Sequence, residues 1–96
     1  MERGIKMVTF ITKETIRRFC QVGAAIYEID KGFGSEPEDY KIIAHTVTKI
    51  EMDFCGMAMV QCGEHCFFET EFGKSVYFTE EQAQNVLQML RKMWKN

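Results

Sequence analysis

The fold is decided by the stretch Met57-Ala58-Met59-Val60-Gln61-Cys62-Gly63-Glu64-His65-Cys66-Phe67-Phe68. Apolar residues are concentrated on both sides of Gly63-Glu64, as expected for two strands joined by a short turn. A glycine at the first central position suits a two-residue type II′ turn. The sequence therefore predicts a β-hairpin with strands over residues 57–62 and 65–72.

The turn also sets the register of this hairpin, because each residue pairs with the residue at the same distance on the other side of the turn. The register separates two faces. The face that we expect to enter the core carries Met57, Met59, Cys66, Phe68 and Phe72. The opposite face carries Val60, Cys62, His65, Phe67, Glu69 and Glu71.

Three further strands are expected around the hairpin. Residues 25–30 alternate like a strand and are followed by a loop that contains the only proline. Residues 40–54 are rich in β-branched and aromatic side chains, and their apolar parity changes between Val47 and Ile50. A β-bulge would explain this change, so we expect one long, bent strand. A short strand is expected over residues 76–78.

A short helix is expected before these strands. Thr12 is a candidate N-cap, and Gly23 suits the left-handed conformation that ends many helices, so the prediction is a helix over residues 12–22. A strand over residues 9–11 that runs into this helix is an alternative. Residues 1–8 are interpreted as a loose leader.

The C-terminal helix has the strongest local signal in the chain. Thr79 and Gln82 have the spacing of a capping box, and apolar residues recur every three or four positions over residues 80–95. The predicted fold class is α+β. We expect a single domain over residues 1–96, with a small bent antiparallel sheet or SH3-like partial barrel of four or five strands in a body over residues 25–78.

Composition limits the class of protein. The chain has 96 residues, of which 46% are apolar and 27% charged, as in an ordinary globular domain. No stretch is long and apolar enough for a membrane helix or for a signal peptide, so we expect a cytoplasmic protein that does not enter a membrane. The four cysteines are then expected to be reduced.

Cysteine and histidine cluster near the hairpin turn, and these are the ligands that zinc prefers. By the register above, Cys66 points away from Cys62 and His65, which leaves two ligands where a structural site needs four. We therefore expect no cofactor. The alternative is a zinc site of Cys62, His65, Cys66 and Cys55, or one completed by Cys20 or His45.

An enzymatic role is not expected. A Cys–His nucleophile pair would need an orienting group or a feature that lowers the thiol pKa, and the sequence marks neither. Nucleic-acid binding would need a basic stripe, but acidic and basic residues are nearly balanced, with a net charge of −2. Direct nucleic-acid binding is therefore also not expected.

The hairpin face opposite the predicted core is interpreted as a protein contact surface. Val60 and Phe67 would form its apolar centre, and His65, Glu69 and Glu71 its mostly acidic rim. Two other interpretations stay open. The N-terminal helix could cover this face, or an unpaired sheet edge could bind a second copy of the chain to form a homodimer.

Residues Phe72-Gly73-Lys74-Ser75-Val76-Tyr77-Phe78-Thr79-Glu80-Glu81-Gln82-Ala83 resemble a recurring tail of small uncharacterised proteins from prophages and mobile elements of gut Firmicutes. The resemblance implies an accessory protein of a phage or mobile element, a group that includes inhibitors of bacterial defence such as anti-CRISPR proteins. We expect a non-enzymatic protein-binding module, with inhibition of a host defence nuclease as the implied role. The alternative is a zinc-stabilised nucleic-acid-binding domain.

Overall fold

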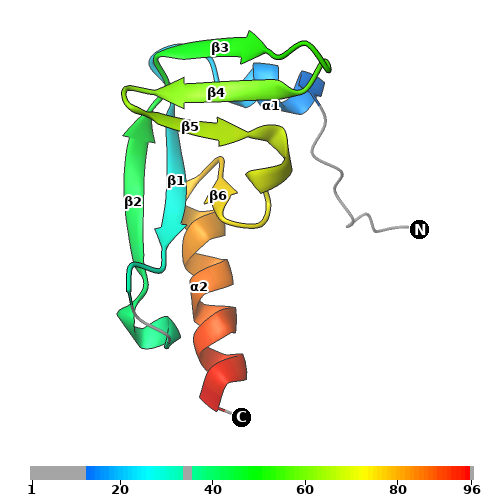
Figure 1. Ribbon diagram of the computed structural model, residues 1–96. Coiled ribbons are helices and arrows are strands. Elements are labelled where there is room, and N and C mark those ends of the chain that lie inside the picture. Colours follow the sequence, from blue (N-terminus) through cyan, green and yellow to red (C-terminus); the bar gives the residue numbers. More distant parts are fainter. Residues whose placement is uncertain (1–12, 34–35, 96) are drawn as a thin grey trace, which may run out of the picture.

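The computed structural model describes residues 13–33 and 36–95, and it has the predicted α+β class (Figure 1). The elements in chain order are α1 (Lys13–Phe19), β1 (Ala25–Asp30), the 3-10 helix η1 (Pro37–Asp39), β2 (Lys41–Thr46), β3 (Lys49–Met52), β4 (Ala58–Cys62), β5 (His65–Phe68), the 3-10 helix η2 (Glu69–Glu71), β6 (Val76–Tyr77) and α2 (Glu80–Lys95). The predicted leader, the strand over residues 9–11 and the Thr12 cap lie outside the described residues.

The strands form two antiparallel sheets of three strands each, in the orders β2-β1-β6 and β3-β4-β5. In Figure 1, β1 and β2 stand upright and the β3-β4-β5 sheet lies across their upper end. The bend that the sequence predicts is therefore sharp enough to separate two sheets.

The break between the sheets falls at Val47 and Thr48, inside the segment that was predicted to be one long strand. Val47 still belongs to the first sheet, because its N–H donates to the Ala24 carbonyl at 2.8 Å. The Thr48 N–H donates instead to the Gln61 carbonyl at 2.8 Å, and Gln61 is also the partner of Lys49. Two residues opposite one residue define a β-bulge. The predicted β-bulge is confirmed, but the prediction of one continuous strand is wrong.

The hairpin register is confirmed at every pair within β4 and β5, from Met59 opposite Phe68 to Cys62 opposite His65. Gly63 has a φ of +65°, and within the described residues no residue other than glycine has a positive φ. This combination agrees with a type II′ turn, in which only the first central residue needs a positive φ. The Thr48 hydroxyl supports the turn by accepting a hydrogen bond from the Gly63 N–H at 3.1 Å.

The predicted orientation of the hairpin faces is wrong. Val60 and Phe67 are buried, with 0% and 5% exposure, whereas Phe68 is 40% exposed. Cys66 and Met59, which were expected in the core, are exposed and half-buried respectively. The reason is that β4 and β5 turn the face of Val60 toward the first sheet and α1. The resulting core contains Ile16, Cys20, Ile26, Val47, Ala58, Val60, Cys62, Phe67, Phe72 and Val76.

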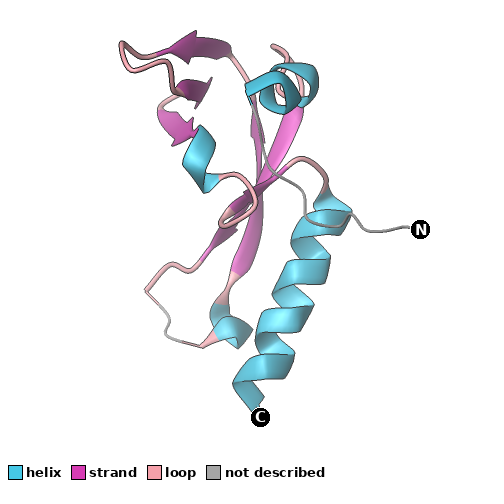
Figure 2. Ribbon diagram, turned by 90° about the vertical axis from the view of Figure 1, so that its right-hand side faces the viewer, coloured by secondary structure: helices cyan, strands magenta, loops and turns pink. Residues whose placement is uncertain are grey.

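The first sheet is covered on both faces. On one face, Ile29 and Tyr77 pack with Ala83 and Leu87 of α2. On the other face, Ile26 and Val76 belong to the core shared with β4, β5 and α1. Figure 2 shows α2 on one side of the upright strands and the second sheet on the other side.

Both helices are close to their predicted positions. The helix α2 has its predicted range, and the Thr79 hydroxyl accepts a hydrogen bond from the Gln82 N–H at 3.1 Å, as expected for an N-cap. The helix α1 ends at Phe19, three residues before its predicted end. The chain then turns through Gly23, which has the expected positive φ, of 95°.

Candidate functional site

Both histidines of the chain lie together where the two sheets meet. His45 is on β2 and His65 is on β5, and their rings are 4.8 Å apart in an edge-to-face arrangement. The Phe67 ring lies 5.0 Å from the His45 ring. The His45 Nε2 atom is 2.9 Å from a carboxylate oxygen of Glu28, and because a carboxylate accepts, the hydrogen lies on Nε2. Both histidines were candidate zinc ligands in the sequence, but only the fold brings their rings together.

The predicted alternative zinc site is not assembled. Cys62 is buried in the core, Cys66 is exposed on the opposite face of the hairpin, and Cys55 is exposed in the turn after β3. His65 is adjacent to Cys62 across the ladder but contacts His45. Over residues 13–33 and 36–95, no three histidine, cysteine or acidic side chains are placed to hold one metal ion.

The buried thiols have the opposite chemistry from that of a catalytic cysteine. Burial, with a further contribution from Cys62, raises the pKa of the Cys20 thiol to about 12. Burial, followed by the effect of Cys66, also raises the pKa of the Cys62 thiol. An activated thiol needs a lowered pKa, because the thiolate is the nucleophile. Cys62 and His65 therefore lack the electrostatics of a nucleophile pair.

Two acidic residues of the predicted contact surface have local structural roles. A carboxylate oxygen of Glu69 accepts a hydrogen bond from the Ala58 N–H at 2.8 Å, at the start of β4. A carboxylate oxygen of Glu71 accepts one from the Phe68 N–H at 2.9 Å, at the end of β5. These contacts replace strand pairing, which explains why the second hairpin strand ends at Phe68 and not at Phe72 as predicted.

The predicted contact surface therefore has no apolar centre that a partner can reach. Of its five residues, Val60 and Phe67 are buried, and Glu69 and Glu71 are half-buried and bonded to the backbone. Only His65 is exposed. The inversion of the two hairpin faces accounts for this correction.

The same inversion creates a different candidate, which we call the outer patch. It is the face of the hairpin that points away from the core, and it consists of Met57, Met59, Cys66 and Phe68. Met59 and Phe68 lie directly opposite each other on neighbouring strands. Lys49 and Glu51 lie on the same face of β3, and their side chains form an ion pair at 2.6 Å. The patch thus has an apolar centre beside a charged margin.

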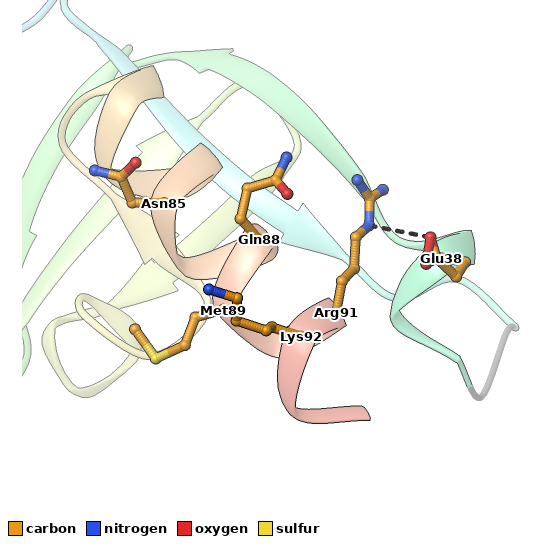
Figure 3. Close-up of a pocket in the computed structure, with 6 residues that line it drawn as sticks. All are labelled: Glu38, Asn85, Gln88, Met89, Arg91 and Lys92. Carbon is orange, nitrogen blue, oxygen red and sulfur yellow. Dashed lines mark ion pairs between the residues drawn. The ribbon is translucent and has the colours of Figure 1, made fainter. Parts of the chain in front are cut away.

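The outer surface of α2 carries a hollow of about 630 Å³, lined by Glu38, Asn85, Gln88, Met89, Arg91 and Lys92. Arg91 joins the helix to η1: its Nε donates to the Pro37 carbonyl at 3.1 Å and lies 3.7 Å from a carboxylate oxygen of Glu38. Figure 3 shows five of these side chains pointing in different directions from α2, and Glu38 facing Arg91 from η1. Small-molecule sites need polar groups that converge on a ligand, so this hollow is a weak candidate.

No protein-family model, no curated protein and no solved structure matches this chain. Within the described part of the chain, no helix has the length and apolar character needed to cross a membrane.

Proposed function

We propose that this chain is a non-enzymatic protein-binding module whose partner contacts the outer patch. The observation that carries the proposal is the pairing of Phe68, which is 40% exposed, with Met59 on the solvent side of a hydrogen-bonded ladder. The ladder holds these side chains in place, so little conformational entropy is lost when a partner binds. An apolar centre beside charged residues is also the usual composition of a protein contact.

The margin of the patch adds specificity to this apolar centre. Lys49 and Glu51 place one charge of each sign next to Met59, so a complementary partner needs an apolar side chain flanked by opposite charges. Phe54, which is fully exposed in the turn between β3 and β4, is a further apolar side chain that a partner can reach. The raised pKa of the buried Cys62 thiol argues against a thiol nucleophile in the hairpin.

The resemblance of residues 72–83 to prophage and mobile-element proteins directs the search toward bacterial partners. Inhibition of a bacterial defence nuclease is the first specific role to examine. An inhibitor of this kind acts by occupying a surface of the nuclease, which requires a rigid contact face and no catalytic group.

The test is affinity capture from a bacterial lysate with the tagged protein and the double variant Met59→Ser/Phe68→Ser. The expected result is at least one bacterial protein that the unmodified chain retains and the double variant loses. Purified, that protein should bind the unmodified chain directly, with the double variant weaker by about tenfold or more, as for loss of apolar residues at the centre of an interface.

The matched control is Met93→Ser, which removes another exposed apolar side chain, 64% exposed on α2, without touching the outer patch. Circular dichroism should show the same fold for all three proteins. If the double variant retains the same proteins as the unmodified chain, or if only Met93→Ser loses them, the outer patch is not the contact surface.

A further inference from the structure

The two sheets have four edges within the described residues, and three of them are protected against pairing with another chain. The strand β6 has only two residues. The Phe68 N–H at the end of β5 is already bonded to Glu71. The strand β3 has four residues, begins next to the Thr48 bulge and carries Lys49. Short strands, bulges and lysines are the usual means of blocking edge pairing.

The outer edge of β2 has none of these features along most of its length. It contains six residues, no proline, and one lysine at its first position. Within the described residues β2 pairs only with β1. Ala44 and Thr46 are exposed on this edge.

The direction of the backbone groups of β2 follows from two hydrogen bonds. The Val47 N–H donates to the Ala24 carbonyl, so the backbone N–H and C=O groups of Val47 point toward β1. The Ile29 N–H donates to the Ser75 carbonyl on the β6 side, so the backbone groups of the odd-numbered residues of β1 point toward β6. Those of the even-numbered residues of β1 therefore point toward β2. Directions alternate along an antiparallel strand. The N–H and C=O groups of Ile42, Ala44 and Thr46 therefore point outward, away from β1.

These three outward positions are complementary to themselves. If a second copy pairs antiparallel to β2 about a two-fold axis at Ala44, Ala44 lies opposite Ala44 of the second copy, and Ile42 lies opposite its Thr46. The outward N–H and C=O groups of all three residues can then form hydrogen bonds between the two copies. The smallest of these side chains lies at the axis, where each copy places the same side chain beside that of the other copy.

The side chains on the other face of β2 also fit this register. Ile43 is 37% exposed, and it would lie opposite His45 of the second copy and diagonal to its Ile43, so pairing would cover both isoleucines. Lys41 would lie opposite Val47 of the second copy. No like charges therefore oppose each other along the paired strands, which favours a second copy over repulsion between copies.

We propose that this protein forms a homodimer through the open edge of β2, which joins two β2-β1-β6 sheets into one six-stranded sheet. The edge does not include the outer patch, so self-association and partner binding are separate properties. A result that excludes the dimer leaves the proposed partner contact at the outer patch unaffected, and the reverse also holds.

The test uses two variants, Ala44→Glu and Ala44→Lys, in sedimentation equilibrium over a range of protein concentrations. The unmodified chain should change from 11.2 kDa toward twice that mass as concentration rises. Each variant alone places like charges at the two-fold axis, and we expect its dimer dissociation constant to rise by about tenfold, the change that corresponds to about 1.4 kcal/mol. An equimolar mixture of the two variants should restore association, because opposite charges then face each other.

Gln84→Glu and Gln84→Lys are the matched controls, because they make the same charge changes at an exposed position of α2 and should leave the dimer unchanged. A second measurement does not depend on mutation: on dimerisation the amide hydrogens of Ile42, Ala44 and Thr46 should become protected from exchange, while those of Ile43 and His45 should change little. The proposal is overturned if the protein is monomeric up to about millimolar concentration. It is also overturned if the mixture fails to restore association, or if these three amides gain no protection.

Discussion

Replacing Phe67 or Phe68 with alanine tests which face of the hairpin is buried. The two residues are adjacent in sequence, so the substitutions are chemically identical and differ only in the side of β5 that they change. Phe67 is 5% exposed, packs in the larger core and lies 5.0 Å from the His45 ring. Phe68 is 40% exposed and lies opposite Met59 on the outer patch.

The expected costs follow from this burial. Phenylalanine-to-alanine changes in a core lower the free energy of unfolding by about 3–5 kcal/mol, so Phe67→Ala should fall in this range. Because Phe68 already contacts water and its removal leaves no enclosed cavity, Phe68→Ala should cost about 1 kcal/mol or less. For a domain of this size, each kcal/mol lowers Tm by about 4–8 °C, so the Tm of Phe67→Ala should fall by at least about 12 °C.

The assay is urea unfolding followed by far-ultraviolet circular dichroism, with thermal melts on the same samples. Since small domains have only about 5–15 kcal/mol of stability in total, Phe67→Leu is included as a milder change, with an expected cost of about 1–1.5 kcal/mol. Its cost should still exceed that of Phe68→Leu. If the Phe68 variants are the less stable in both pairs, the core lies on the other face, and the outer patch and its proposed function are wrong.

The thiols offer two further predictions. In the folded protein a thiol reagent should modify the exposed Cys55 and Cys66 quickly, and should reach the buried Cys20 and Cys62 only after denaturation; four fast thiols would contradict the described core. Stability should also fall as the pH rises above about 9, because the unfolded chain loses the Cys20 proton near that pH while the folded chain holds it to a pKa of about 12. The contribution is complete below pH 9 and lost as the pH approaches 12, and the pH dependence should be less steep in Cys20→Ala. Equal slopes for the two proteins would refute this origin.

Local signals in the sequence predicted the elements that depend on neighbouring residues. The Gly63-Glu64 turn set the hairpin register, since a two-residue turn leaves one way to pair the adjoining strands. Thr79 and Gln82 marked the start of α2 because a cap bonds residues three positions apart. Both predictions were confirmed for the same reason, which is that the interactions lie within a few residues of the chain.

Other features of the candidate sites depend on residues far apart in sequence. The pairing of His45 with His65 and the bond from His45 to Glu28 join three strands, and no local pattern connects them. Glu69 and Glu71 looked like surface residues of a strand, but their carboxylates bond to backbone N–H groups that the strand leaves unpaired. The change of parity near Val47 was visible, yet whether it bent one sheet or separated two could not be read from it.

By itself, the sequence determined the α+β class, the range of α2 and the pairing of Val60 with Phe67 and of Met59 with Phe68. It could not determine which of these two pairs is buried, because both are apolar and alternation along a strand separates two faces without assigning either to the interior. The tertiary structure decided this point when the chain crossed from one sheet to the other at Val47 and Thr48 and turned the face of Val60 toward β1 and α1. The orientation of a strand pair is set by what packs against it, and that information is carried by distant parts of the chain.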